Sequence, residues 1–367
     1  MFLNPSANTW RYQTPPKSTS SESQVLAFHQ GLPDYNQTPL VPLPDLAKEL
    51  GIGHALLKDE SNRFGLPAFK ILGASWATQK LLAQKCNLPP TSSLQDLGRA
   101  ASSQNLTLVT CTEGNWGRAI ARMSNYLSLS CTIFVPSFMP PTTLLPIALE
   151  GANVIITEGS YDDTVRAVRK EAEKEGRLLV MDIGWEGYEE VPQWVVEGYG
   201  TMLAETDARI EGLKLPPVTH AIASVGVGSW AQAAVQHYKS ASNPHHASVI
   251  TVEPDTAASL KASLEAGKIT SIATGHTIMD GMNCGTVSYT AWPVLKEGVD
   301  ASVEVSDVEA HRDLIYLHER GVRNGPCGAA PLSALRRLAK EGKLGLGKDS
   351  VVVLFSTEGS RAYVAPE

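Results

Sequence analysis

The stretch "LTLVTCTEGNWGRAIARMSNYLSLSCTIFVP" (residues 106–136) holds two apolar runs with a helical pattern between them. The runs 106–111 and 130–136 are rich in valine, isoleucine and threonine, residues typical of buried strands. The intervening segment opens with glycine and asparagine and then spaces its apolar residues as a helix does. A strand, a helix and a second strand at this spacing predict a βαβ unit with two parallel strands in one sheet.

The same alternation extends along the chain and predicts an α/β fold with parallel sheets covered by helices. Further strand patterns are "ANVIITEG" (152–159), "GRLLVMDIG" (176–184), "VTHAIASVG" (218–226), "ASVITVE" (247–253) and "DSVVVLFSTEG" (349–359). We expect two lobes: a larger domain of residues 36–99 and 206–367, and a smaller α/β domain of residues 100–205. Residues 1–35 are expected to form an N-terminal arm.

Composition narrows the class of protein. The 367 residues are 43% hydrophobic and 19% charged, which is typical of a soluble globular chain, and the net charge of −7 does not attract nucleic acid or anionic membranes. No apolar run approaches the roughly 20 residues of a membrane helix. The five cysteines form no CxxC pair and His245–His246 lacks further ligands at metal spacing, so we expect a cytoplasmic protein without a metal site.

The segment "SVGVGSWAQAAV" (224–235) is a glycine turn between a strand and a helix. Gly226 and Gly228 allow the backbone to approach a ligand closely, and the helix N-terminus favours an anion such as phosphate. A second interpretation is open, because Gly226, Gly228 and Ala231 also match the G-x-G-x-x-A fingerprint of NAD-binding proteins. In that interpretation Glu253, which ends the next strand, would bind the ribose.

A lysine stands at an unusual place in "LPAFKILGASWATQK" (66–80). Lys70 opens a helical pattern and has apolar neighbours on both sides, so its amine is a candidate for chemistry. Polar residues also lie where the apolar runs of several strand patterns end: Glu113 in the turn of the 106–136 segment, Asp182, and Ser356. Ligands of parallel α/β proteins gather at such strand ends.

These features together suit pyridoxal phosphate (PLP). A lysine can bond the PLP aldehyde, an asparagine at residue 115 can meet the ring oxygen, and the turn 226–230 can hold the phosphate. A hydroxyl at Ser356 or Thr357 can face the pyridine nitrogen. The alternative, an NAD-dependent dehydrogenase, would account for the glycine turn but not for the other three features.

The sequence resembles the fold-type II PLP enzymes, the tryptophan synthase β-like family, and among them the diaminopropionate ammonia-lyases. The resemblance runs from about residue 36 to 361. It rests on "DESNRFGLPAFKILGASWA", "TEGNWGRAIA", "DIGWEGYEEVP", "GVGSWAQAA", "VEPD", "MDGMNCGTVS" and "FSTEG". The resemblance implies a two-lobed fold-type II architecture, a small amino-acid substrate and a homodimer.

Carried over by position, the resemblance assigns the site residues. Cofactor-binding residues are expected to be Phe69, Lys70 as the Schiff-base lysine, Asn115, Gly226, Val227, Gly228, Ser229, Trp230, Ser356 and Thr357. Substrate-binding residues are expected to be Thr112, Gly114, Asn115, Trp116 and Asp182. Catalytic residues are expected to be Lys70, Glu113 and Asp182.

The chain departs from the lyase pattern at two positions, where that pattern has aspartate and histidine and this sequence has Glu113 and Trp116. The implied activity is the PLP-dependent α,β-elimination of 2,3-diaminopropionate, or of a similar β-substituted amino acid, to pyruvate and ammonia. The alternatives are a β-replacement synthase, a serine or threonine dehydratase, a racemase, and a non-catalytic paralogue that binds PLP or an amino acid.

Overall fold

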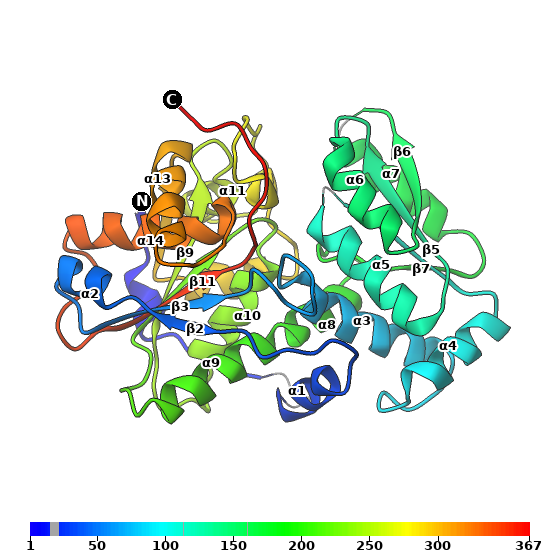
Figure 1. Ribbon diagram of the computed structural model, residues 1–367, viewed down its shortest axis with the longest axis horizontal. Coiled ribbons are helices and arrows are strands. Elements are labelled where there is room, and N and C mark those ends of the chain that lie inside the picture. The colour runs from blue at the N-terminus through cyan, green and yellow to red at the C-terminus, as the bar shows by residue number, and fades with distance from the viewer. Residues whose placement is uncertain (15–21, 113, 160) are drawn as a thin grey trace. The chain divides into compact units, whose positions relative to one another are not determined.

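The chain folds into two compact units, each with its own sheet of mainly or wholly parallel strands (Figure 1). The computed structural model describes residues 1–14, 22–112, 114–159 and 161–367. The larger unit comprises residues 1–26, 36–69 and 199–367, and the smaller unit comprises residues 27–35 and 70–198. The predicted α/β class with parallel sheets is confirmed.

The larger unit is built on a seven-stranded sheet of order β1-β10-β9-β8-β11-β3-β2. The five inner strands run parallel, while β1 and β2 pair antiparallel at the edges. Helices α14 and α10 pack against the sheet. The elements are β1 (Phe2–Leu3), η1 (Pro5–Asn8), α1 (Glu22–Gln30, shared with the smaller unit), β2 (Leu40–Pro42), α2 (Pro44–Leu50), β3 (His54–Asp59), α9 (Gly200–Gly212), β8 (His220–Ser224), α10 (Ser229–Tyr238), β9 (Ser248–Pro254), α11 (Ser259–Ala266), η2 (Asp280–Met282), α12 (Trp292–Gly298), β10 (Ala301–Val305), α13 (Asp307–His318), α14 (Pro326–Lys340) and β11 (Val351–Ser356).

The smaller unit has a four-stranded parallel sheet of order β6-β5-β4-β7. Successive residues of β4 point to opposite faces, so Val109 and Cys111 pack with Val168 of α7, while Thr110 meets α5. The elements are α3 (Lys70–Lys85), α4 (Leu94–Ser103), β4 (Thr107–Cys111), α5 (Asn115–Leu127), β5 (Cys131–Pro136), α6 (Pro141–Leu149), β6 (Asn153–Thr157), α7 (Tyr161–Ala172), β7 (Arg177–Leu179) and α8 (Glu190–Gly198).

The units divide the chain at different residues from the predicted ranges. Residues 70–99, expected in the larger domain, belong to the smaller unit because α3 packs against α5 and α8. The expected N-terminal arm also holds ordered structure: Phe2–Leu3 pairs with β10, and Ala7 is fully buried. Helix α1 follows at Glu22–Gln30.

A buried ion network fixes the chain segment that leads to Lys70. The Arg63 guanidinium is 0% exposed and donates to both carboxylate oxygens of Glu60 (2.7 and 2.8 Å) and of Glu205 (2.7 and 2.8 Å). Lys58 on β3 donates to Glu205 on α9 at 2.7 Å. Burial by itself raises the pKa of Glu205, but the hydrogen bonds and charges of Arg63 and Lys58 outweigh it and lower the pKa to about 2. Two cations thus balance two anions inside the larger unit.

A second ionic contact joins α10 to α9 and to the start of α1. The His237 imidazole contacts Asp207 at 2.7 Å through Nε2 and Glu22 at 3.1 Å through Nδ1. Burial opposes the charge on His237, but the hydrogen bonds to the two carboxylates outweigh it and raise its pKa to about 9. His237 is therefore a protonated imidazole at neutral pH.

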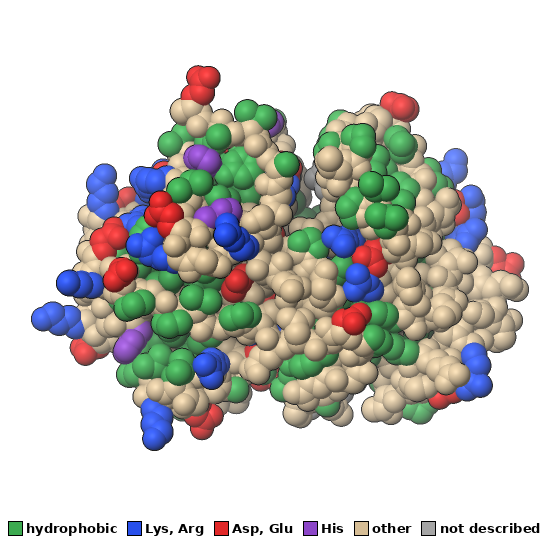
Figure 2. Space-filling view, in the orientation of Figure 1, with side chains coloured by type: hydrophobic (Ala, Val, Ile, Leu, Met, Phe, Trp, Pro, Cys, Tyr) green, Lys and Arg blue, Asp and Glu red, His purple; other side chains and the backbone are tan. Residues whose placement is uncertain are grey.

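The surface in Figure 2 carries interspersed acidic and basic side chains. Hydrophobic side chains also reach the surface, among them Leu145 and Leu149 of α6 and Ile155 and Ile156 of β6. Within the described ranges, no helix is long and apolar enough to span a bilayer.

Replacing Arg63 with methionine should lower the free energy of unfolding by about 3–5 kcal/mol, because Glu60 and Glu205 would be left buried without their main counter-charge. Chemical denaturation measures the loss. The matched control is Arg99→Met, which removes a solvent-exposed pair with Asp96 and should change stability far less, because water and salt screen exposed charges. Equal losses for the two variants would contradict the assigned strength of the buried network.

The His237 contacts should make stability depend on pH. The folded pKa of about 9 exceeds the ordinary 6.5, so the contribution is complete below pH 6.5 and is lost as pH rises through 9. We expect His237→Gln to lower stability by roughly 1–3 kcal/mol at pH 6 and hardly at all at pH 10. Thermal unfolding across this range, with the exposed His276→Gln as control, measures the effect. A pH-independent loss would contradict the assignment.

Candidate functional site

The predicted phosphate turn joins β8 to α10 in the larger unit. Gly226 leaves no room for a side chain, since a Cβ there would lie 2.8 Å from the carbonyl oxygen of Gly281. Gly228 adopts a left-handed conformation (φ 99°) directly before α10 begins at Ser229. The first N–H groups of a helix have no carbonyl partner within it, so this turn presents donors to an anion.

The end of β11 brings hydroxyl groups next to β8. Thr357 Oγ1 lies 3.2 Å from Ser224 Oγ, and the Thr357 carbonyl accepts a hydrogen bond from the Phe69 amide at 3.4 Å. The Ser356 hydroxyl is 0% exposed and has no hydrogen-bond partner among the residues that the structure describes. A buried hydroxyl without a partner is costly, which indicates that it serves a ligand.

Phe69 connects these elements within the larger unit. Its ring lies 5.7 Å from the Trp230 ring at the start of α10 and 4.8 Å from the Tyr199 ring. Phe69 directly precedes Lys70 in the sequence. The packing of the Phe69 ring therefore fixes the position of the backbone just before the predicted Schiff-base lysine.

Lys70 is the first residue of α3 in the smaller unit and makes an ion pair there. Its Nζ donates to Asp182 Oδ2 at 2.6 Å and lies 6.0 Å from the centroid of the Trp116 ring. The Asp182 side chain is 11% exposed and that of Lys70 is 21% exposed, so both are largely shielded from water. Three predicted site residues that are distant in sequence are thus brought together.

The position of Asp182 is set by Tyr188 in the segment "WEGYEE". The Tyr188 hydroxyl donates to the Leu179 carbonyl at 2.9 Å and accepts from the Met181 amide at 3.0 Å. The Tyr188 ring stacks on Trp185 with centroids 4.5 Å apart. These contacts hold the chain directly before Asp182.

The polar turn between β4 and α5 is organised by Thr112. Its hydroxyl oxygen accepts from the amides of Gly114 (2.9 Å) and Gly117 (3.0 Å), which uses its lone pairs and leaves its O–H as a donor. Asn115 begins α5, is partly exposed and has no side-chain hydrogen bond to another described residue. Glu113 lies outside the described residues.

The NAD interpretation of the glycine turn required Glu253 to bind a ribose. The Glu253 carboxylate is 1% exposed and accepts from the amides of Leu260 (2.7 Å) and Lys261 (2.9 Å) at the start of α11. Burial raises the pKa of Glu253 to about 7, against the opposing effect of these hydrogen bonds. Its oxygens are therefore engaged inside the protein.

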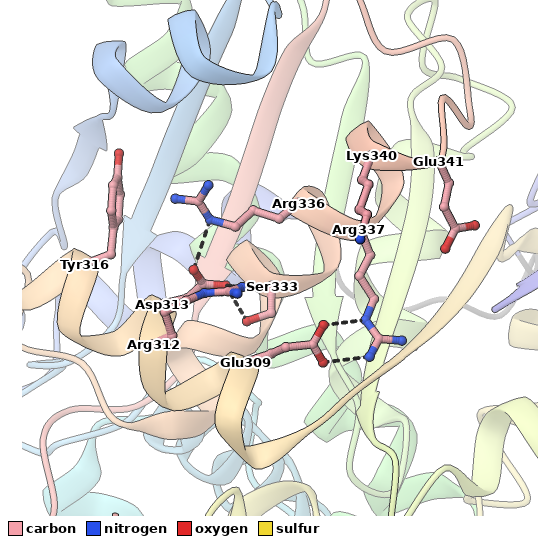
Figure 3. A pocket seen from close by; sticks show the side chains of 9 residues that line it. All are labelled: Glu309, Arg312, Asp313, Tyr316, Ser333, Arg336, Arg337, Lys340 and Glu341. Atoms are coloured by element: carbon pink, nitrogen blue, oxygen red, sulfur yellow. Dashed lines mark hydrogen bonds and ion pairs between the residues drawn. The ribbon is translucent and has the colours of Figure 1, made fainter. Parts of the chain in front are cut away.

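A groove of about 630 Å³ lies between α13 and α14, and none of the predicted site residues lines it (Figure 3). Its charged side chains mainly satisfy one another: Arg337 makes two hydrogen bonds to Glu309, and Asp313 accepts from Arg336 and Ser333. The groove is lined by Glu309, Arg312, Asp313, Tyr316, Ser333, Arg336, Arg337, Lys340 and Glu341.

The predicted residues therefore form one cluster in each unit. Lys70, Trp116 and Asp182 lie together in the smaller unit, and Phe69 lies with Trp230 and Thr357 in the larger one. Ser224, the last residue of β8, was not among the predicted site residues, although a polar residue at a strand end two positions before Gly226 was a signal for it.

Comparisons with known proteins agree on one family. A family model described as "Pyridoxal-phosphate dependent enzyme" matches residues 32–357. Diaminopropionate ammonia-lyase of Escherichia coli (strain K12) is 33% identical over 362 residues, covering 95% of this chain and 90% of the relative. The enzyme of the same name from Salmonella typhimurium (strain LT2) is 32% identical over 357 residues, covering 92% and 88%.

A solved structure has a similar fold. The crystal structure of diaminopropionate ammonia lyase from Escherichia coli in complex with D-serine matches with a TM-score of 0.84 and 30% sequence identity. The match covers 98% of this chain and 93% of that one.

Proposed function

Since this chain belongs to the family of pyridoxal-phosphate-dependent enzymes, we propose that it eliminates ammonia from 2,3-diaminopropionate. With one water, the substrate would give pyruvate and two molecules of ammonia. The observation that carries the proposal is the identity of 33% over 95% of the chain to a diaminopropionate ammonia-lyase, together with a lysine and an aspartate in contact at the matching motifs.

The residues of the larger unit fit the cofactor. The buried Ser356 hydroxyl lacks a partner within the described chain and suits the pyridine nitrogen, to which it can donate without transferring its proton. Gly226 permits close backbone approach, and the turn 226–230 ends at the N-terminus of α10, which suits the phosphate. We propose that Thr357 assists Ser356 and that Asn115 binds the ring oxygen.

Lys70 is the proposed covalent attachment point and base. When bound, pyridoxal phosphate supplies an aldehyde for the amine and an electron sink for the carbanion. The Lys70 amine would remove the α-proton of the substrate. Asp182, 2.6 Å from Nζ, stabilises the ammonium that forms on Lys70 after this transfer.

Asp182 is also the proposed contact for the leaving group. The β-ammonium of diaminopropionate is a cation, and a shielded carboxylate binds it and holds it as the carbon–nitrogen bond breaks. A serine hydroxyl has no charge for Asp182 to bind. This difference favours diaminopropionate over serine at the same position.

Trp116 and Glu113 are the remaining residues that we propose to face the substrate. Trp116 is 5% exposed and lies beside Lys70, so its ring limits the size of the substrate, while Thr112 and Gly114 are expected to bind the carboxylate. We propose Glu113 as a second base that serves the enantiomer whose α-proton Lys70 does not reach.

We also propose a cytoplasmic homodimer. The five cysteines carry no disulfide, which supports a reducing compartment. The homodimer rests on the family resemblance alone, and sedimentation of the purified protein measures it.

Replacing Lys70 with alanine should abolish the visible absorption of bound pyridoxal phosphate and all turnover, because no amine remains to bond the aldehyde. Borohydride reduction of the unaltered protein should leave a stable adduct on the peptide that contains Lys70, detectable by mass spectrometry. The control is Lys85→Ala, an exposed lysine at the end of the same helix, which should keep colour and activity. A coloured and active Lys70→Ala protein would contradict the assignment of Lys70 as the residue that bonds pyridoxal phosphate.

A substrate panel tests the proposed reaction. Pyruvate release should be fastest from 2,3-diaminopropionate and much slower from serine, and threonine should yield little 2-oxobutyrate, because only the first substrate presents a cation to Asp182. Both enantiomers of diaminopropionate should react. Glu113→Gln should slow one enantiomer and spare the other. Preference for serine or threonine would favour a dehydratase instead.

A further inference from the structure

A second buried polar side chain without a partner lies close to Ser356. Asn324 is 0% exposed, and neither its side-chain nitrogen nor its side-chain oxygen has a hydrogen-bond partner in the described part of the chain. An amide side chain offers two donors and an acceptor, so leaving all of them unused inside a protein carries a large cost.

The backbone of Asn324 is firmly held, so the side chain is not placed by chance. The Asn324 carbonyl oxygen contacts His318 Nε2 at 2.8 Å and accepts from the Ser360 hydroxyl at 3.3 Å. Asn324 also forms a β-bridge with Gly359, just beyond the end of β11. The main chain thus fixes the amide close to the strand end that carries Ser356.

Gly328 shows that Asn324 and Ser356 border the same space. A Cβ built on Gly328 would lie 2.5 Å from Ser356 Oγ and 3.1 Å from Asn324 Cβ. The glycine lies in the first turn of α14, and a side chain there would clash with Ser356 and press tightly against Asn324. Two buried polar groups without partners therefore lie around a point that the sequence keeps free of side chains.

A neighbouring carboxylate has a structural role that Asn324 lacks. Glu358 is 4% exposed and accepts a hydrogen bond from the Cys327 amide at 3.0 Å, which anchors the N-terminus of α14. Its carboxylate is hydrogen-bonded within the protein, whereas the Asn324 and Ser356 side chains have no hydrogen-bond partner among the residues that the structure describes.

We infer that Asn324 is a further cofactor-binding residue, whose side-chain amide contacts pyridoxal phosphate at the pyridine-nitrogen end, beside Ser356. This inference rests on the proposed use of that cofactor. It extends the set of binding residues from the strand end to the segment that precedes α14.

The test replaces Asn324 with leucine, which has a similar size and no polar atoms. If the amide serves the cofactor, protein freed of pyridoxal phosphate with hydroxylamine should unfold at an equal or higher temperature in the variant, because buried polar atoms without partners are removed. The dissociation constant for pyridoxal phosphate, followed by absorbance, should rise about tenfold, the effect of one lost hydrogen bond. The absorption maximum of the bound cofactor should also move.

Two further variants keep the result decisive. Asn324→Asp keeps the shape of the side chain and loses the amide donors, so it should also weaken binding, and it reports on binding if the leucine variant misfolds. Asn125→Leu, an exposed asparagine on α5, should leave the dissociation constant unchanged.

The outcomes separate this inference from the proposed function. If the unaltered protein binds no pyridoxal phosphate, the proposed function fails. If it binds the cofactor and the Asn324 variants bind it equally well, the inference alone fails. A cofactor-free leucine variant that unfolds at a lower temperature also overturns it, because Asn324 would then have a structural role.

Discussion

The hydrogen bonds of the Arg63 guanidinium fix the conformation of the backbone segment that leads to Lys70. Its planar fork donates to two buried carboxylates, and a lysine could not reproduce this because its ammonium is a single point of charge. The network holds the following residue, Phe64, at a positive φ of 54°, which costs energy for a bulky side chain. The Asn36 side chain accepts from the Phe64 amide at 2.7 Å and supports the same conformation. The segment then runs through Phe69 directly to the proposed catalytic lysine.

Buried polar groups that lack a hydrogen-bond partner point to the ligand site as clearly as the hydrogen bonds that the structure shows. Most buried polar groups in native proteins have partners, so a buried hydroxyl or amide without one indicates a ligand or a water molecule. Among the described residues the Ser356 hydroxyl has no hydrogen-bond partner, whereas the Thr357 hydroxyl contacts Ser224. The same test disfavours a dinucleotide, because the carboxylate of Glu253 is already satisfied by backbone amides.

Much of the fold could be predicted from the sequence because its parallel strands are short apolar runs between helical patterns. β10 was not predicted, since Ser302 and Glu304 interrupt its apolar residues. The unit boundary was also misplaced: a helix pattern shows that α3 has an apolar face but not which sheet that face meets. At the site, Lys70 was named from its place at the start of a helical pattern and Asp182 from its place at a strand end, and the family resemblance gave their roles, but their contact depends on the tertiary fold. The direction in which Glu253 points likewise cannot be read from a glycine fingerprint.

The surrounding structure accommodates Trp116, which stands where the resembling lyases have a histidine. A tryptophan in place of a histidine would be poorly placed if its indole N–H were buried without a partner. In this chain the N–H donates to Thr110 Oγ1 at 2.9 Å and to the Val180 carbonyl at 3.3 Å, one from β4 and one from the chain just after β7. These two hydrogen bonds hold the ring against the sheet. The centroid of this ring lies 6.0 Å from Lys70 Nζ, so the proposed limit on substrate size rests on a side chain that is held by the same part of the sheet that leads to Asp182.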